Sequence, residues 1–300
     1  MDRLQSLEVF VRVAELGAFA KAARDLGVSP PAATRAVAAL EERLGTRLLV
    51  RTTRSVRLTE SGARFLADAK RLLGELQDAE DSAAGAHAEP RGELRITAPL
   101  LFGRLHVAPV LAEFLELYPG VTAEAHFLDR SVNLMEEGLD LALRIGPLSD
   151  SSLIAIKVGE LRQLVFASPD YLARAGTPEK PDDLADHRLI HANSVSMLPE
   201  WRFQMEGKER SFRFQPRLSM NSNDAVRAVA EGGWGIARLL CYQVAEALAE
   251  GRVVRLLEAY EPDPLPVHLL HLEGRRASAK LRAFVDFAGE RLRARLAALP

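Results

Sequence analysis

Residues 18–44 read Ala-Phe-Ala-Lys-Ala-Ala-Arg-Asp-Leu-Gly-Val-Ser-Pro-Pro-Ala-Ala-Thr-Arg-Ala-Val-Ala-Ala-Leu-Glu-Glu-Arg-Leu. This stretch predicts two short helices, Ala18–Leu26 and Pro30–Leu44, joined by the turn Gly27-Val28-Ser29. Glycine suits the left-handed residue that closes a helix, serine is a good N-cap, and proline at the first helical position loses no hydrogen bond. Two helices joined by a three-residue turn that contains glycine form a helix-turn-helix, whose second helix can enter the major groove of DNA.

The second of these helices is expected to have one buried and one outward face. The apolar residues that recur at spacings of three and four form the buried stripe: Ala33, Ala36, Val37, Leu40 and Leu44. On the outward face, Arg35 can hydrogen-bond a guanine edge through two donors, and Thr34 can contact a base or a phosphate. Pro31 and Ala38 can touch a thymine methyl group. Ala-rich helical hairpins also occur in ordinary bundles, but the agreement of helix, turn, cap and the basic segment downstream favours DNA binding.

A basic segment, expected to form a hairpin over Arg51–Arg57, follows the second helix. Arg47 and Arg57 extend the cluster, and no acidic residue lies between Glu42 and Glu60. Arginine and hydroxyl groups on a turn are suited to phosphate contacts, which position a protein on DNA without reading its sequence. A solvated charge run is the alternative. The residues predicted to contact DNA are Ser29, Pro30, Pro31, Thr34, Arg35, Arg51, Thr52, Thr53 and Arg54.

Charge is distributed unevenly along the chain. The 300 residues carry a formal net charge of −2, but the first 65 hold 11 Lys and Arg against 7 Asp and Glu. Positive charge is therefore concentrated where DNA would bind. The length predicts about two domains, and a hydrophobic content of 48% is enough for more than one core.

The composition also bears on compartment and chemistry. The single cysteine, Cys241, excludes an intrachain disulfide and a cysteine-based zinc site, which fits a reducing cytosol. Without a signal-peptide pattern or a long apolar run, the chain is expected to be a soluble cytoplasmic protein with no membrane partner. No histidine lies near Cys241 in the sequence, and neither a Gly-rich phosphate loop nor a Gly-x-Ser-x-Gly elbow is present. The sequence thus predicts no catalytic residue, no metal site and no cofactor, so we do not expect an enzyme.

Helical sequence without proline runs from Thr59, a plausible N-cap, to about Ala84. Its apolar residues alternate spacings of four and three, as in a coiled-coil seam. The seam expected to pair with a second copy of the chain is Phe65, Ala69, Leu72, Leu76 and Ala79. Packing of this helix on its own domain is the alternative. A stretch rich in Gly, Ala and Pro over Ala83–Gly92 then marks a hinge.

From Glu93 onward, strands alternate with helices, which predicts an α/β domain with a mostly parallel sheet. The expected strands are Leu94–Ala98, Val121–Phe127, Leu139–Ile145, Leu164–Ala167, Arg188–Ala192, Val253–Leu256 and Val267–Leu272. The expected helices are Leu105–Tyr118, Asp224–Glu231, Tyr242–Glu250 and Ser278–Leu296. Ligands of such sheets bind at the carboxyl ends of the strands, often at helix N-termini.

Several motifs together give the chain a resemblance to the LysR-type transcriptional regulators over its whole length. In the N-terminal part they are Phe19–Leu26, Val28-Ser29, Thr34–Val37, Leu40-Glu41, Leu44-Gly45, Arg51–Arg54 and Leu58–Gly62. Downstream they are Tyr118-Pro119, Leu139–Gly146, Ala167–Leu172 and Gly251–Val254. The N-terminal set is highly specific, whereas each downstream set alone would be weak.

The resemblance implies a fold of three parts. Residues 1–60 would form a winged helix-turn-helix, with the motif itself at about 19–38, and residues 59–90 would form a dimerising linker helix and hinge. Residues 91–300 would form a two-lobed α/β effector-binding domain that resembles periplasmic binding proteins. Lobe I would hold residues 91–162 and 267–297, and lobe II residues 163–266, joined by two crossing strands.

Two departures from the family pattern stand out. The family commonly has Gln-Ser where this chain has Pro30-Pro31, which removes two polar groups from the expected DNA interface. After Gly235-Ile236-Ala237 the family often continues to Leu-Pro, whereas here Arg238 follows. That arginine would place an extra charge near the expected cleft or the crossing strands.

The resemblance also points to effector-binding positions at strand ends and at a helix start. They are the turn Pro99, Leu100, Leu101 and Phe102, together with Arg144, Trp201, Asn221 and Ser222. Arg144 can anchor a carboxylate through two hydrogen bonds, or it can form a structural ion pair with a neighbouring acid. Trp201 can stack on a ligand, or it can belong to the core of its lobe.

The implied partners are double-stranded operator DNA, a small-molecule effector of unknown identity, and further copies of the chain in a homodimer or homotetramer. A cytoplasmic solute-binding protein and an enzyme with an accessory DNA-binding domain are the alternatives. The basic N-terminal module counts against the first. The second would require a catalytic constellation, which the sequence does not show.

Overall fold

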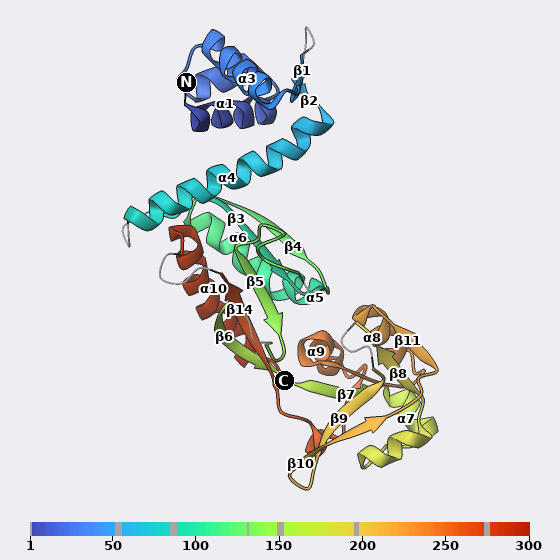
Figure 1. The fold of residues 1–300 in the computed structure, drawn as a ribbon. Coiled ribbons are helices and arrows are strands. Elements are labelled where there is room, and N and C mark those ends of the chain that lie inside the picture. Colours follow the sequence, from blue (N-terminus) through green and yellow to red (C-terminus); the bar gives the residue numbers. More distant parts are fainter. Residues whose placement is uncertain are drawn as a thin grey trace. The chain divides into compact units, whose positions relative to one another are not determined.

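The computed structural model describes residues 2–51, 56–84, 89–130, 132–148, 153–194, 198–272 and 277–300 (Figure 1). The chain divides into two compact units. One is Met1–Glu93 with Arg275–Ala279, and the other is Leu94–Gly274 with Lys280–Pro300. Each unit has its own hydrophobic core.

The N-terminal unit is mainly helical. Its elements are α1 (Arg3–Leu16), α2 (Phe19–Asp25), α3 (Pro30–Leu44), the strands β1 (Leu49–Arg51) and β2 (Val56–Leu58), and α4 (Glu60–Ala84). The expected helix-turn-helix is therefore present as α2 and α3. Gly27 has a φ of +65°, as a left-handed residue after a helix requires. The Ser29 hydroxyl accepts a hydrogen bond from the Ala32 N–H at 3.3 Å, which caps α3.

The core of this unit lies between α1, α2 and α3. It includes the fully buried Phe10 of α1 and Leu40 of α3, and each such side chain contributes about 1.5–3 kcal/mol of burial free energy. The stripe predicted for α3 is buried over Ala33, Ala36, Val37 and Leu40. Leu44, the last residue of the helix, is 40% exposed, so its predicted place in the buried stripe is wrong.

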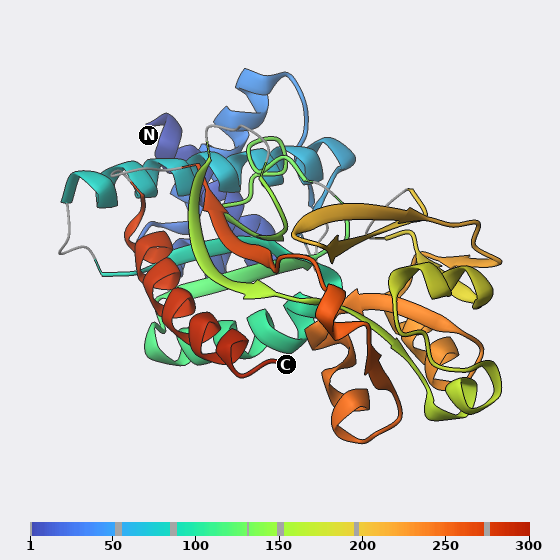
Figure 2. The ribbon, with the colours of Figure 1, turned by 90° about the horizontal axis from the view of Figure 1, so that it is seen from below.

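The second unit contains two five-stranded sheets, each forming a lobe. The sheet of lobe I has the order β4-β3-β5-β14-β6. Its strands are β3 (Gly92–Ala98), β4 (Val121–Phe127), β5 (Leu141–Ile145), β6 (Ile154–Leu161) and β14 (Leu265–His271). One continuous helical stretch follows β3, made of α5 (Leu100–Phe102), the π-helical turn η2 (Gly103–Val107) and α6 (Ala108–Leu117). The C-terminal α10 (Ala279–Ala297) lies beside α6, where the Phe114 and Phe284 rings are 5.1 Å apart (Figure 2).

The sheet of lobe II has the order β11-β8-β12-β7-β13. Its strands are β7 (Gln163–Ala167), β8 (Leu189–Ala192), β11 (Leu218–Met220), β12 (Ile236–Leu240) and β13 (Val254–Leu256). Its helical elements are α7 (Pro169–Ala175), η3 (Pro181–Asp186), α8 (Asn223–Glu231), α9 (Cys241–Ala249) and η4 (Glu258–Tyr260). A separate antiparallel ribbon consists of β9 (Glu200–Met205) and β10 (Lys208–Arg213).

The chain crosses between the lobes twice. The first crossing is Arg162, the single residue between β6 and β7, and the second is the segment 261–264 between η4 and β14. Because both crossings are short, the relative angle of the lobes can change through only a few backbone dihedral angles.

The expectation of a mostly parallel sheet is wrong, since both sheets are mixed. In lobe I, β3 and β5 are parallel, but β14 is antiparallel to β5 and β6. In lobe II, β8 is parallel to β11 and β12, but β7 is antiparallel to β12 and β13. The reason is the double crossing: a strand that returns from the other lobe enters its sheet in the opposite direction.

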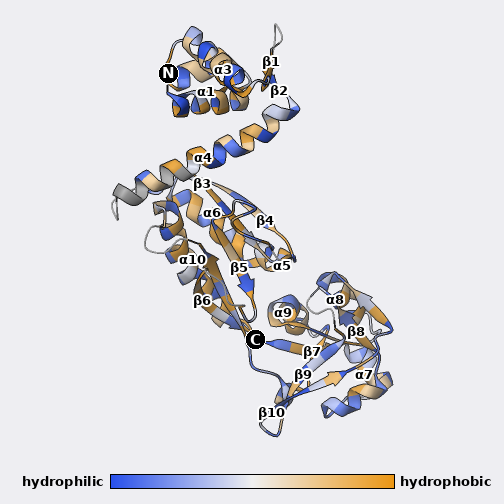
Figure 3. Cartoon of the chain, in the orientation of Figure 1, coloured by the Kyte–Doolittle hydropathy of each residue, from blue (hydrophilic) through white to orange (hydrophobic). Residues whose placement is uncertain are grey.

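Two further corrections concern local structure. Residues 99–102 are not a turn, because Pro99 is the N-cap of α5 and the helix begins at Leu100. The strands β6, β9, β10 and β11 have no counterpart among the expected strands. The charged strand β10 and the half-exposed β6 lack a hydrophobic pattern strong enough to mark them. Figure 3 shows this mixture, with hydrophobic residues prominent in β3 and β5 and hydrophilic ones in the β9–β10 ribbon.

Candidate functional sites

The outward face of α3 carries most of the residues expected to read DNA bases. Pro30, Pro31 and Arg35 are exposed, and Thr34 is half-buried. Arg35 forms no ion pair with any residue that the structure describes, so its guanidinium is free to donate hydrogen bonds. Ser29 is also exposed, but its hydroxyl already caps α3 and therefore stabilises the helix.

The β1–β2 hairpin presents basic residues beside this helix. Leu49 pairs with Leu58 and Arg51 with Val56. Arg47 and Arg57 are exposed. The predicted contacts Thr52, Thr53 and Arg54 lie outside the described residues, as does the side chain of Arg51.

Glu41, which the sequence analysis did not assign to any site, ties the hairpin to α3. Its Oε1 accepts hydrogen bonds from the N–H groups of Leu48 at 2.8 Å and Leu49 at 3.0 Å. A side chain of α3 thereby provides the acceptor for two backbone N–H groups at the start of β1. The pair Leu40-Glu41 is one of the motifs that carry the family resemblance, but the sequence did not show that Glu41 contacts the hairpin.

The seam expected on α4 is divided by the structure. Ala69 is fully buried in the core of its own unit, and Phe65 lies 5.5 Å from the Phe10 ring of α1. The prediction that Ala69 faces a second chain is therefore corrected, because the core of its own unit already covers it, whereas Phe65 is half-buried and packs in part against α1. Leu72 is 44% exposed, Ala79 is exposed and Leu76 is half-buried, so the seam is most open over these three residues.

Among the cavities of the described part of the second unit, two are lined by residues of both lobes. Cavity A has a volume of about 210 Å³, and its lining includes Pro99, Asp129, Arg144, Asn223 and Tyr242. Cavity B has a volume of about 520 Å³, and its lining includes Leu100, Leu101, Arg104, Phe127, Asn221 and Ser222. Asp129 and Asn223 line both cavities. Six of the eight effector positions suggested by the resemblance thus line one cavity or the other.

Two arginines line cavity A, Arg130, which binds Glu137, and Arg144. Arg144 lies near the end of β5, and its Nη1 donates a hydrogen bond to the Leu143 carbonyl at 3.0 Å. Its Nη2 is buried and has no hydrogen-bond partner among the described residues. Burial lowers the pKa of Arg144, and the nearby Glu137 opposes this shift. The structural ion pair considered from the sequence is absent from the described residues, where no acidic group lies within ion-pair distance of this guanidinium.

An aromatic cluster lies next to cavity A. Phe102 is fully buried, and its ring is 5.3 Å from that of Tyr242, at the start of α9. His106 packs against both rings, at 4.7 Å from Phe102 and 5.6 Å from Tyr242. Phe102 therefore supports a wall of the cavity through Tyr242 and is not part of the lining. Burial raises the pKa of Tyr242, so its hydroxyl stays protonated and can donate a hydrogen bond.

Cavity B has mostly apolar walls, and glycine shapes one of them. A Cβ atom at Gly103 would lie 2.4 Å from the Phe127 ring, so only glycine allows this ring to approach η2. Leu100 and Leu101 come from the helix that continues into η2. Interruptions of α-helices by π-helical turns often occur at functional sites.

Trp201 lies away from both cavities. Its side chain is 4% exposed in the core of lobe II, where its ring is 5.0 Å from that of Phe214. The Arg238 guanidinium lies 5.6 Å from the Trp201 ring and donates a hydrogen bond to the Arg202 carbonyl at 3.0 Å. Burial lowers the pKa of Arg238 to about 10. The extra charge expected near the cleft or the crossing strands lies at the second of these places, because Arg238 pairs with Val165 of β7, and its guanidinium lies over the Trp201 ring.

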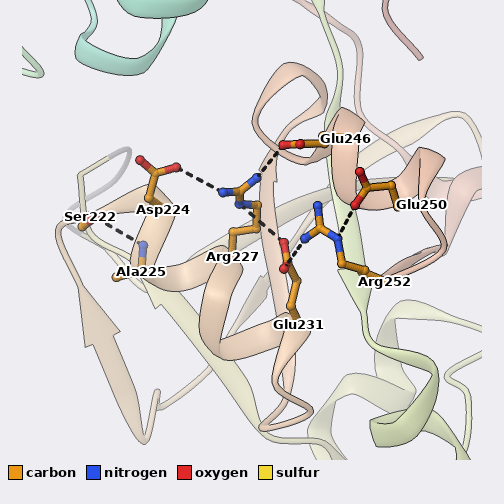
Figure 4. A network of polar contacts seen from close by, with 8 residues as sticks. All are labelled: Ser222, Asp224, Ala225, Arg227, Glu231, Glu246, Glu250 and Arg252. Carbon is orange, nitrogen blue, oxygen red and sulfur yellow. Dashed lines mark hydrogen bonds and ion pairs between the residues drawn. The ribbon is translucent and has the colours of Figure 1, made fainter.

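A polar network holds α8, whose first turn contributes to both cavities (Figure 4). Arg227 forms ion pairs with Asp224 at 3.7 Å, Glu231 at 3.5 Å and Glu246 of α9 at 3.8 Å. Arg252 pairs with Glu231 and Glu250. The Ser222 hydroxyl caps the helix by accepting from the Ala225 N–H at 3.3 Å. These contacts join α8 to α9 and so fix the positions of Asn223 and Tyr242.

The described part of the chain offers neither a site for a metal ion nor a helix that could span a membrane. No group of three or more His, Cys, Asp or Glu residues there is arranged to hold a metal ion. No helix within it is long and apolar enough to cross a membrane. Cys241 is buried, and burial raises the pKa of its thiol.

Comparison with known proteins covers both units. Residues 4–63 match the family model of the bacterial regulatory helix-turn-helix protein, lysR family, and residues 87–293 match that of the LysR substrate binding domain. The chain is 34% identical to the transcriptional regulator CrgA of Neisseria meningitidis serogroup C, over 96% of each chain. It is 35% identical to the regulator PtxR of Pseudomonas aeruginosa, over 96% of this chain and 93% of PtxR.

Solved structures agree with these matches. The structure of CrgA from Neisseria meningitidis, described as a LysR-type transcriptional regulator, aligns with a TM-score of 0.61 over 96% of this chain and 98% of CrgA, at 34% identity. The full-length Vibrio cholerae virulence activator AphB aligns with a TM-score of 0.59 over 96% and 98% of the two chains, at 28% identity.

Proposed function

This chain belongs to the LysR-type family of transcriptional regulators, and we propose that it binds operator DNA under the control of a small-molecule effector held in cavities A and B. As a regulator of bacterial genes it acts in the cytoplasm, where the chromosome lies, and its task is binding and not catalysis.

On DNA, α3 enters the major groove. Arg35 reads a guanine edge, and Pro31 with Thr34 contacts neighbouring bases. The remaining groups position the protein on the sugar-phosphate backbone: Ser29, Pro30, Arg51, Thr52, Thr53 and Arg54. A dimer formed through Leu72, Leu76 and Ala79 places two such helices on paired half-sites, and a dimer of dimers extends the same arrangement.

The observation that carries the effector part of this proposal is the state of Arg144. A buried guanidinium nitrogen without a partner is costly, and here it lies in the lining of a cavity. An anionic group of a ligand would satisfy it with a charge-assisted hydrogen bond. A ligand that contacts both lobes favours their closed arrangement by its differential affinity, and closure then changes how the effector domains pack in the oligomer.

The test compares the full chain with its Arg144→Ala variant. A thermal-shift screen of small organic acids and aromatic compounds first identifies a ligand, because binding raises the melting midpoint. That ligand should then change the affinity of the wild type for its own promoter fragment. Arg144→Ala should bind the fragment normally without ligand and lose the response to it. Loss of DNA binding would reveal a structural role, and a full response would place the effector elsewhere.

A further inference from the structure

Asp129 is the charged side chain that cavities A and B share. It lies two residues beyond β4, and its Oδ1 accepts a hydrogen bond from the Leu100 N–H at 2.9 Å. Its second oxygen has no hydrogen-bond or ion-pair partner among the described residues. Asp129 thus lines both cavities with a carboxylate oxygen that can still accept from a donor.

Arg144 offers the complementary charge in cavity A. Its buried Nη2 is without a partner, and no ion pair between Arg144 and Asp129 is formed in the described structure. The other charged groups near them are engaged: Arg130 binds both carboxylate oxygens of Glu137 at 2.7 and 2.8 Å, and Asp224 pairs with Arg227. Arg104, at the rim of cavity B, is exposed to solvent. Cavity A therefore contains a buried guanidinium nitrogen without a partner, and the exposed side chain of Asp129 adds a carboxylate oxygen that can still accept a hydrogen bond.

The neutral groups around them divide into polar and apolar regions. Near the charges, the Asn223 Oδ1 accepts from the Ser194 hydroxyl at 2.8 Å, which leaves the amide nitrogen of Asn223 as a donor. Away from them, Leu100, Leu101 and Phe127 line cavity B. A ligand that fits this arrangement carries a carboxylate, a cationic donor close to it, and an apolar body.

We propose that the effector is an α-amino acid with a large apolar side chain. Its carboxylate binds Arg144, its ammonium group binds Asp129, which lines both cavities, and its side chain occupies cavity B. This inference rests on the proposed function, because it names the ligand class of the same site. A carboxylic acid without the ammonium group would bring a second negative charge toward Asp129 without compensation, and an amine without the carboxylate would leave Arg144 unpaired.

The experiment uses the full-length chain and measures binding by calorimetry at pH 7. The probes are L-leucine, L-methionine, L-phenylalanine and L-tryptophan. L-Phenylalanine has two matched analogues: 3-phenylpropanoate lacks the ammonium group, and 2-phenylethylamine lacks the carboxylate; the same pair of analogues is made for whichever amino acid binds best. Each analogue should bind about tenfold to a hundredfold more weakly than its amino acid, since each lacks one charge-assisted contact.

Three variants assign the contacts. Asp129→Asn keeps the oxygen that accepts from Leu100 and removes the charge, so it should abolish the preference for the amino acid over its deaminated analogue. Arg144→Gln should weaken the binding of both compounds. Arg210→Gln, on the exposed strand β10 and outside the lining of both cavities, is the matched control, and its affinities should be unchanged. All three variants should melt as the wild type does without ligand and should bind operator DNA.

Two outcomes would overturn the amino-acid proposal. In one, the deaminated analogue binds the wild type as tightly as the amino acid, and in the other, none of the four amino acids binds. Neither outcome would contradict the proposed regulatory function. That function would be contradicted by a different result, namely that the ligand-free wild type does not bind its promoter fragment.

Discussion

At the scale of single residues, two arginines stand out because their surroundings leave their donors available. Arg35 is exposed on the outward face of α3, and Arg144 keeps a buried nitrogen without a partner beside cavity A. Most other arginines described in the second unit are engaged, as Arg255 is with Glu261 at 2.6 Å. Guanidinium groups without an internal partner are the ones that can bind an external ligand.

The first prediction separates base reading from phosphate contact. Arg35→Ala should lower the preference for operator over random DNA by about 1–3 kcal/mol, because it removes a contact to a base edge. Arg54→Ala should weaken binding to both kinds of DNA similarly and reduce the magnitude of the salt slope by about 1, because it removes a phosphate contact. Fluorescence anisotropy with operator and scrambled duplexes measures both effects. Identical behaviour of the two variants would show that the roles are assigned wrongly.

At the scale of elements, the recognition helix and the hairpin behave as one piece because Glu41 joins them. The carboxylate accepts from two backbone N–H groups at the start of β1. At the same end of the hairpin, the Thr59 hydroxyl donates to the Arg47 carbonyl at 2.8 Å and accepts from the Gly62 N–H at 2.9 Å. Side chains from α3 and from the start of α4 thus hold the open end of the hairpin.

The second prediction concerns this junction. Glu41→Ala should destabilise the hairpin locally by about 1–3 kcal/mol, since it leaves two backbone donors without their acceptor. Hydrogen exchange of the Leu48 and Leu49 amides should then speed up about tenfold or more. Glu41→Gln keeps an acceptor oxygen and should recover most of the protection. Unchanged exchange in the alanine variant would mean that the carboxylate contributes little.

The third prediction tests the open part of the α4 seam. Leu72→Asp combined with Leu76→Asp would bury charges if this surface pairs with a second copy, and unpaired buried charges are strongly unfavourable. Sedimentation should therefore show monomers or a weakened dimer, with weaker operator binding. Met135→Asp, at a residue 71% exposed in the second unit, is the control and should leave the mass unchanged. A double variant with the mass of the wild type would exclude this surface as the dimer contact.

At the scale of the whole molecule, function depends on separate units that carry different charge and different cores. The chain has a net charge of −2, yet its first 65 residues have an excess of basic groups. In the second unit, Glu261 of the second crossing binds Arg255 of β13 and lies 3.8 Å from Arg162 of the first crossing. The two connections between the lobes are thereby tied to each other, and a change in lobe angle involves both.

The fourth prediction follows from the local charge. Binding of the full chain to DNA should weaken steeply with salt, with a slope of about −0.9 in log K against log salt for each phosphate neutralised. Titrations at several salt concentrations measure the slope directly. A flat response would contradict a phosphate-contacting basic hairpin, whatever the sequence preference.

The amino-acid sequence by itself determined the helix-turn-helix, the long α4 helix and the α/β class of the second unit. The signals for these features are local: Gly27 and Ser29 mark the ends of α2 and α3, and apolar spacing within one segment shows which face is buried. The resemblance to LysR-type regulators pointed to Arg144 and to the start of α8 as site positions, and both stand at the ends of recognisable elements.

Only the tertiary structure decided what lies opposite each of these faces. Periodicity shows that a side chain is buried but does not identify its partner. It could not show that Phe65 and Ala69 pack against the core of their own unit. Nor could it show that Trp201 lies in the core of lobe II with Arg238 over its ring. Asp129 and Tyr242 carried no local signal, because they reach the cavities through pairing between segments far apart in the chain. The mixed direction of both sheets has the same cause, since strand pairing depends on where the chain crosses between lobes and not on the pattern within a strand.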